Sequence, residues 1–189
     1  MKTKALILAI TALFIASTTS FAQQKEEESA STTLQFMKSS GSFLVKEFYD
    51  LAVIKGVTCK VLIITDVVSN KKIGCMRLET EYRSSYSSSP DTYVGTLDAD
   101  ELDACIRSLT YLKDNILSKD AETYTEAQYT SRDKVEIGAY FNESKKKWTA
   151  YVQTKSYTSR SMEFFEAANL DALAAEMQKA KDMILEKTK

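Results

Sequence analysis

The sequence contains no histidine among its 189 residues. Histidine is the commonest general base and the commonest transition-metal ligand, so this chain alone cannot build a Ser-His-Asp or Cys-His catalytic site. Glycine is scarce as well: five are present, and neither GxGxxG nor GxxxxGK[ST] occurs. The common dinucleotide- and phosphate-binding loops are therefore excluded, and we expect no cofactor.

Cysteine is also rare, and no two cysteines form a CxxC pair. A structural zinc site is therefore not expected, and we predict no other metal site. Each cysteine lies in an apolar stretch, which is typical of buried free thiols. An exported protein could instead form one disulfide, and that alternative stays open at the level of sequence. The three residues are Cys59, Cys75 and Cys105, and the bridge would join Cys59 to Cys75.

The chain lacks an excess of basic residues. Its formal net charge is −1 at pH 7 and its pI is about 5.7. This balance gives no electrostatic footprint for nucleic acid or an anionic membrane, so both are disfavoured as partners. Beyond the N-terminus no apolar run approaches the roughly 20 residues that cross a bilayer, so we expect no membrane span in the mature chain.

Residues 1–22 have the pattern of a secretory signal peptide. Lys2 and Lys4 precede the apolar run Ala5–Ala16, and Ser20-Phe21-Ala22 places small residues where a signal peptidase cleaves. The ending FAQQ resembles the signal peptides of secreted Bacteroidetes proteins. The sequence therefore predicts export, either to the periplasm or out of the cell.

After a polar leader, the chain contains two units with the same order of elements. Residues 23–42 are rich in Ser and Glu and predict a flexible leader that docks its few apolar residues. Residues 43–118 and 119–189 each predict four strands followed by a helix, from β-forming runs, turn signals and a 3.6-residue apolar period. Asp98 or Asp100 is expected to cap the first helix. The apolar leader residues are Leu34, Phe36 and Met37; strands are expected at about 43–53, 57–68, 72–82, 92–97, 123–130, 133–141, 147–157 and 161–167, and helices at 101–117 and 169–185.

The two units share residues as well as element order, which indicates an internal duplication. ELDACIRSLTYLKDNIL (101–117) aligns with NLDALAAEMQKAKDMIL (169–185), and KVLIITDVVSNKK (60–72) aligns with KVEIGAYFNESKK (134–146). LETEY and VQTKSY then end the third strand of each unit. Two unrelated amphipathic helices would share mainly an apolar stripe, but these share polar positions too. The identical helix pairs are Leu102/Leu170, Asp103/Asp171, Ala104/Ala172, Lys113/Lys181, Asp114/Asp182, Ile116/Ile184 and Leu117/Leu185.

Strand alternation predicts that the second unit has one dry and one wet sheet face. In the first unit, residues 61–64 and 67–68 are apolar on both faces, so this strand should be covered twice: by a helix, by the other unit, or by another subunit in a homodimer. Tyrosines occupy the wet face of the second sheet, where flat rings with hydroxyl groups suit a sugar or a partner protein. Tyrosine is also an ordinary strand former. The dry-face residues are Val135, Ile137, Ala139, Phe141, Trp148, Ala150 and Val152, and the candidate ligand-binding residues are Tyr140, Tyr151, Lys155 and Tyr157.

This order of elements resembles the Whirly proteins and the related transcriptional-coactivator single-stranded-DNA binders, in which two ββββα units pair about a two-fold axis. The resemblance spans roughly residues 43–187 and rests on element order, without a shared sequence motif. It implies a tandem α+β fold with antiparallel sheets and one helix per unit. It also implies single-stranded nucleic acid as ligand, which the acidic charge disfavours. A TATA-binding-protein-like or β-lactamase-inhibitor-like duplicated α+β fold is the alternative architecture.

Carboxylates are the remaining candidates for chemistry. Glu79 and Glu81 share a strand face, as a glycosidase pair would, but Arg77 and Arg83 lie on that face and favour a charge-balanced surface. The acidic stretch 98–103 lacks the glycine of a calcium loop, so helix capping explains it better. We therefore expect no catalytic residue and interpret the protein as an exported, non-enzymatic binding module for a protein or a glycan. A carboxylate-only enzyme, such as a glycosidase or lyase, and a single-stranded nucleic-acid binder are the alternatives.

Overall fold

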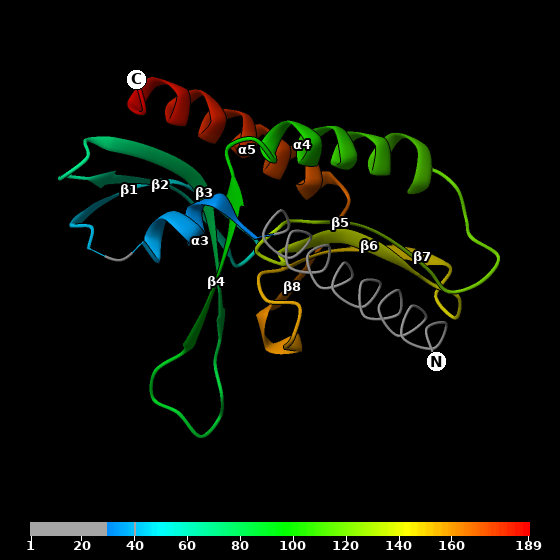
Figure 1. The fold of residues 1–189 in the computed structure, drawn as a ribbon. Helices are drawn as coiled ribbons and strands as arrows, with labels where there is room; N and C mark the ends of the chain where they lie inside the picture. The colour runs from blue at the N-terminus through cyan, green and yellow to red at the C-terminus, as the bar shows by residue number, and fades with distance from the viewer. Residues whose placement is uncertain (1–29, 40) are drawn as a thin grey trace, which may run out of the picture. The chain divides into compact units, whose positions relative to one another are not determined.

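Two four-stranded antiparallel sheets form the framework of the protein (Figure 1). In both sheets the strands follow one another in chain order, so every connection is a hairpin between neighbours. The α+β class with duplicated four-stranded antiparallel units is confirmed. The strands are β1 (Leu44–Ile54), β2 (Val57–Asp66), β3 (Lys71–Tyr82) and β4 (Asp91–Asp98) in the first sheet, and β5 (Thr125–Thr130), β6 (Glu136–Asn142), β7 (Lys147–Gln153) and β8 (Met162–Phe165) in the second.

The computed structural model describes residues 30–39 and 41–189. The predicted signal peptide, residues 1–22, and the first part of the predicted leader lie outside the described residues. Within the described part of the chain, no helix is long and apolar enough to cross a membrane.

Each long helix packs against the sheet of the other half. Helix α4 (Leu102–Tyr111), which continues as a π-helix over Leu112–Ile116, contacts β5, whereas α5 (Ala168–Lys187) contacts β1, β2 and β3. Figure 1 shows α5 running over the first sheet and α4 over the second. The predicted apolar stripes face inward: Leu102, Cys105, Leu109 and Leu112 of the first helix, and Leu170, Leu173, Met177, Ala180 and Ile184 of the second, are buried.

The two long helices also contact one another through a reciprocal pair of salt bridges. Lys113 Nζ lies 2.8 Å from Asp171 Oδ1, and Lys181 Nζ lies 2.6 Å from Asp103 Oδ1. Lys113 and Lys181 occupy equivalent positions in the aligned helices, and so do Asp103 and Asp171. These two polar identities, four residues in all, therefore form one contact twice, as two copies related by a local two-fold axis would.

Strand β2 is covered on both faces, as its sequence predicts. Val61 and Ile63 belong to the main core, while Leu62 and Ile64 form a smaller cluster on the opposite face. The cover on that face is a short helix of the leader, α3 (Thr32–Met37), whose Phe36 and Met37 pack on this cluster together with Leu44 and Ile73. The sequence predicted the docking but not the helix. Val67 and Val68, expected to extend the strand, lie exposed in the turn after it.

The carboxylate of Asp98 attaches α3 to the sheet. Its oxygens accept hydrogen bonds from the backbone N–H groups of Thr32 (2.7 Å) and Thr33 (3.1 Å) and from Ser31 Oγ (3.0 Å). Burial alone would raise the pKa of this carboxyl, but hydrogen bonds from Thr33, Thr32 and Ser31 hold it below its usual value. The prediction that Asp98 or Asp100 caps α4 is wrong: the cap residue is Glu101, whose side chain makes no capping hydrogen bond and instead accepts from the backbone N–H groups of Asp98 and Arg132. The two aspartates are engaged elsewhere, Asp98 with α3 and Asp100 with Arg132.

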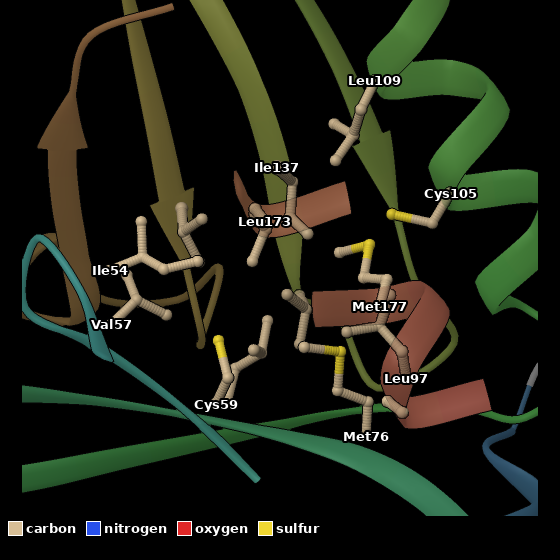
Figure 2. Packing of buried hydrophobic residues seen from close by; sticks show 14 of the residues in the cluster. Ile54, Val57, Cys59, Met76, Leu97, Cys105, Leu109, Ile137, Leu173 and Met177 are labelled. Carbon is tan, nitrogen blue, oxygen red and sulfur yellow. The ribbon is translucent and has the colours of Figure 1, made fainter. Parts of the chain in front are cut away.

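One hydrophobic core contains residues of both halves (Figure 2). In Figure 2, Cys59 and Met76 of the first sheet point toward Ile137 of the second sheet and Met177 of α5. All three cysteines are free and fully buried, so the alternative of a Cys59–Cys75 disulfide is not realised. Burial raises the pKa of the thiols of Cys59 and Cys75 to about 12, and it raises that of Cys105 as well, so all three are protonated at neutral pH.

Candidate functional site

The face of the second sheet that points away from the core carries most of the polar side chains of this sheet, together with Tyr140, Tyr151 and Phe164. Ile137 and Ala139 of β6 are fully buried in the core, so the alternate positions Glu136, Gly138 and Tyr140 occupy the opposite face. Strand register then places these positions in rows across the sheet. The rows are Glu126–Tyr140–Thr149, Gln128–Gly138–Tyr151–Phe164 and Thr130–Glu136–Gln153–Met162.

Four aromatic rings form a connected cluster on this face, which we call the aromatic face. The ring of Tyr140 lies at its centre, with centroids 6.2 Å from Tyr124, 6.5 Å from Tyr151 and 6.1 Å from Phe164. These are the tilted and edge-on geometries that aromatic pairs prefer. Tyr124 and Phe164 are more than half exposed, at 57% and 53%, whereas Tyr151 is buried at 3%. Tyr124 and Phe164 are therefore the exposed rings of the cluster, and Tyr151 is its buried ring.

At the centre of the sheet, the missing side chain of Gly138 lets the Tyr151 ring cross β6 and reach Gln128 on β5. Its register partners on either side are Gln128 and Tyr151, and the Tyr151 hydroxyl donates a 2.7 Å hydrogen bond to Gln128 Oε1. The phenol thus bridges two strands that are separated by the strand of Gly138. A Cβ at Gly138 would collide with the carbonyl oxygen of Ala127 and lie 2.8 Å from Gln128 Cα, so any larger residue would shift the edge strand.

A hollow of about 290 Å³ lies on the aromatic face. Two carboxylates and two amides accompany the rings, and no basic side chain is among the described residues that line it. Its hydrogen-bonding groups alternate with apolar surface, as in sites that bind ligands by stacking and by directed polar contacts. The lining residues are Tyr124, Glu126, Gln128, Glu136, Tyr140, Tyr151, Gln153, Met162 and Phe164.

The two carboxylates give this hollow a negative potential. The Tyr124 hydroxyl donates to Glu126 Oε1, and this hydrogen bond raises the pKa of Tyr124. Burial raises the pKa of Tyr151 to about 12, with the charges of Glu126 and Glu136 adding to the effect. Among the described residues Glu136 forms no ion pair and no hydrogen bond through its side chain. Within the part of the chain that the structure describes, neither carboxylate of this face forms an ion pair.

The structure brings together two of the four residues that the sequence nominated. Tyr140 and Tyr151 line the hollow, although Tyr151 is covered by its neighbours. Lys155 lies elsewhere: its Nζ is 3.1 Å from Oδ1 of Asp133, a buried residue whose other oxygen accepts a 2.9 Å hydrogen bond from the backbone N–H of Thr96. Lys155 thus helps to join the two halves. Tyr157 is 80% exposed and does not line the hollow.

Sequence reasoning did not identify Tyr124, Glu126 and Phe164 as members of this surface. A signal existed in TYTEAQYT, where Tyr124, Glu126 and Gln128 share one side of a strand by simple alternation. Alternation does not say which face of the sheet that side occupies. The register with β6, which pairs Glu126 with Tyr140, decides it.

The other carboxylates of the sequence analysis are engaged in structural contacts. Glu79 forms salt bridges with Arg77 and with Lys60, the latter at 3.3 Å. Burial alone would raise the pKa of Glu79, but the hydrogen bond and charge of Arg77 lower it below its usual value. In the acidic stretch 98–103 the carboxylates contact α3, Arg132 and α5. No group of three or more potential metal ligands occurs among the described residues.

A larger hollow of about 460 Å³ lies between α4 and the core side of β5 and β6. Its lining is mostly the apolar stripe of the helix and the strands beneath it, including Leu109, Leu112, Ile116 and Ile137. Arg107, Ser108 and Gln128 also line it, but no carboxylate is among the described residues that do. We therefore take the aromatic face as the candidate site.

Comparisons of the chain with protein-family models, with curated proteins and with solved structures find no match. The likeness to the Whirly proteins thus stays a resemblance in the order of elements.

Proposed function

We propose that this protein is a non-enzymatic binding module whose protein or glycan partner lies on the aromatic face of the second sheet. The observation that carries the proposal is the cluster of Tyr124, Tyr140 and Phe164, whose rings lie beside hydrogen-bonding groups in a hollow. Covering exposed aromatic rings with a flat apolar partner stabilises the complex, and Tyr and Phe are enriched at protein interfaces. The core side of the same sheet is occupied by α4 and the core, which leaves this face for a partner.

Export forms part of the proposal and rests on the sequence pattern of residues 1–22. The mature protein would then meet its partner in the periplasm or outside the cell. Partners in that setting include envelope proteins and surface glycans, which match the two ligand classes that the aromatic face suits.

A binding screen tests the proposed function. The mature protein is applied to arrays of glycans and of envelope proteins, beside the variants Tyr140→Ala and Phe164→Ala. Tyr86→Ala serves as the matched control, because Tyr86 is 99% exposed in the loop before β4 and lies outside the aromatic face. We expect a ligand that the control retains and both site variants lose. Binding unaffected by either site variant would contradict the assignment of this face.

The carboxylate-only enzyme is the second candidate, because Glu126 and Glu136 line the same hollow. Paired carboxylates on a sugar-binding face are the minimum that a glycosidase needs. Incubation with a panel of chromogenic glycosides and uronate polymers distinguishes the two functions. Turnover that Glu126→Gln and Glu136→Gln each abolish would establish the enzyme and overturn the binding module.

A further inference from the structure

The polar groups of the aromatic face offer a partner mainly hydrogen-bond acceptors. Four donor groups are already used within the protein: the Tyr124 hydroxyl on Glu126, the Tyr151 hydroxyl on Gln128, Nε2 of Gln128 on Thr130 Oγ1 (3.3 Å), and Nε2 of Gln153 on the carbonyl oxygens of Lys155 (3.1 Å) and Thr158 (3.0 Å). Of the groups that remain, the Tyr140 hydroxyl can donate or accept, whereas the carboxylates of Glu126 and Glu136 can only accept. A partner must therefore supply donors.

The unused acceptors are carboxylate oxygens. Glu126 binds the Tyr124 hydroxyl through Oε1 alone, and Glu136 has no ion pair or side-chain hydrogen bond among the described residues. Because Glu136 is only partly exposed, a partner that approached it without positive charge would leave a desolvated carboxylate unpaired. The hollow thus favours a cationic donor over a neutral one.

We propose that the aromatic face binds an arginine side chain of a partner protein, with the guanidinium stacked on the Tyr140–Tyr124 pair and paired with the carboxylate of Glu126. Glu136 lies two residue rows farther along the sheet and adds to the negative potential that attracts this cation. This inference rests on the proposed function and names the chemistry that its partner presents. A guanidinium is planar, always charged and weakly hydrated, so it stacks on aromatic rings and meets carboxylates through parallel N–H donors. A lysine ammonium is more strongly hydrated and has no flat face to stack.

Phosphate-bearing partners fit this surface poorly. Single-stranded nucleic acid could stack its bases on the rings, but its backbone would bring negative charge toward Glu126 and Glu136. A neutral sugar could stack as well, but it would leave the two carboxylates without a counter-charge. Charge complementarity therefore selects an arginine-bearing segment from the protein class of partners.

Titration with blocked tripeptides tests the inference. The mature protein, labelled with ¹⁵N, is titrated with Gly-Arg-Gly, Gly-Lys-Gly and Gly-citrulline-Gly, each acetylated and amidated. Citrulline is a neutral isostere of arginine and isolates the charge. We expect amide shifts at β5, β6 and β7 with the arginine peptide, about tenfold weaker binding for citrulline, and weakening by added salt.

The variants locate the interaction. Glu126→Gln combined with Glu136→Gln should weaken arginine binding by about tenfold or more, while Glu81→Gln on the first sheet should leave it unchanged. Each variant keeps the side-chain size, and its ¹⁵N spectrum reports whether the fold is intact. Equal binding of the lysine or citrulline peptide would overturn the arginine assignment, and so would the absence of shifts on this face.

The failure of this inference is distinguishable from the failure of the proposed function. A neutral glycan or an arginine-free protein that binds here and is lost in Tyr140→Ala would sustain the binding module and overturn the arginine inference. A face that binds neither these peptides nor any member of the arrays would contradict both.

Discussion

The hydroxyl groups of Thr80 and Thr154 lie 2.9 Å apart in the core, and the two residues are 74 positions apart in the chain. The same spacing relates the aligned stretches 60–72 and 134–146, and these threonines occupy equivalent places in LETEY and VQTKSY. Two equivalent residues touch one another only near a symmetry axis. Together with the reciprocal salt bridges of the long helices, this contact places a local two-fold axis between the halves.

The two threonines have different roles in this contact, so we expect their substitutions to lower the free energy of unfolding by different amounts. Thr80 donates its single hydroxyl proton to Ser161 O at 3.1 Å, so Thr154 must donate to Thr80. Thr80→Val would leave the Thr154 hydroxyl buried without an acceptor and cost about 1–3 kcal/mol, whereas Thr154→Val removes one bond and costs about 0.5–1.5 kcal/mol. Urea unfolding of both single variants and the double variant measures this. A double variant whose loss equals the sum of the single losses would contradict the coupling.

Gly74 of β3 tests whether the last helix covers the first sheet. A Cβ at this position would lie 2.7 Å from Ile184 Cγ2 of α5 and 2.9 Å from Ile63 Cδ1. Gly74→Ala should therefore destabilise the protein by about 1–3 kcal/mol through overpacking. Ile184→Ala creates space at the same point, so the added methyl should cost less in the double variant than in the wild type. Thermal unfolding checks this, and additive losses would mean that α5 does not press on β3.

The reciprocal salt bridges predict that a charge reversal can be rescued by its partner. Asp171→Lys places two lysines together at Lys113 and should lower the denaturation midpoint, while the added change Lys113→Asp should restore it. The equivalent exchange at Asp103 and Lys181 should behave alike, since the contact is repeated. High salt should shrink both effects because the partners are partly exposed. A swap that rescues one pair but not the other would argue against equivalent geometry.

The hydrogen bonds of Asp98 predict that α3 detaches from the sheet at acid pH, and the reactivity of the Cys75 thiol can report this. Since hydrogen bonds hold the folded pKa of Asp98 below its ordinary 3.8, its contribution to stability is complete above that value and is lost as the pH falls below it. Asp98→Asn should mimic the acid form, release α3 and expose Cys75, so this thiol should react faster with a disulfide reagent. Asp100→Asn is the control, because Asp100 pairs with Arg132 but not with α3. Peptide mapping identifies the modified cysteine, and equal reactivity of Cys75 in both variants would refute the attachment.

The raised pKa of the Tyr151 hydroxyl predicts that the protein loses stability at alkaline pH. Its pKa rises from 10.0 to about 12 on folding, so the unfolded chain releases this proton first. The stabilisation is complete below about pH 10 and is lost as the pH rises toward 12. Tyr151→Phe should be about 1 kcal/mol less stable than the wild type at neutral pH, from the lost bond to Gln128. This deficit should narrow and then reverse as the pH rises from 10 to 12, because only the wild type loses the stabilisation. Guanidinium unfolding across this range, with Tyr157→Phe as an exposed control, measures the change. A deficit that stays constant with pH would contradict the burial of Tyr151.

Local patterns in the sequence were enough to predict the elements and their order. Apolar period and turn residues placed the eight strands and the two long helices close to their observed bounds, because these signals act over a few residues. Helix α3 escaped prediction because it is six residues long, and its attachment depends on Asp98, which is distant in the chain. The end of β2 was placed too late, because Val67 and Val68 look like strand residues until the turn excludes them.

Only part of the candidate site could be predicted. Alternation shows which residues of one strand point the same way, but the pairing register is needed to decide which face of the sheet they occupy. Tyr140 and Tyr151 were found from one hairpin. Tyr124, Glu126 and Phe164 required the pairing of β5 with β6 and of β7 with β8. Lys155 appeared to share the wet face, but the strand ends at Gln153 and the chain then turns Lys155 toward Asp133.

The sequence by itself determined that the chain builds one ββββα pattern twice, because apolar periodicity and turn residues are properties of neighbouring residues. Tertiary structure alone decided that each long helix covers the sheet of the other half and that Thr80 meets Thr154. It also decided that most donors of the aromatic face are used within the protein, while its two carboxylates form no ion pair among the described residues. These relationships join residues far apart in the chain, and they exist only once the close packing of the two halves has fixed which side chains meet.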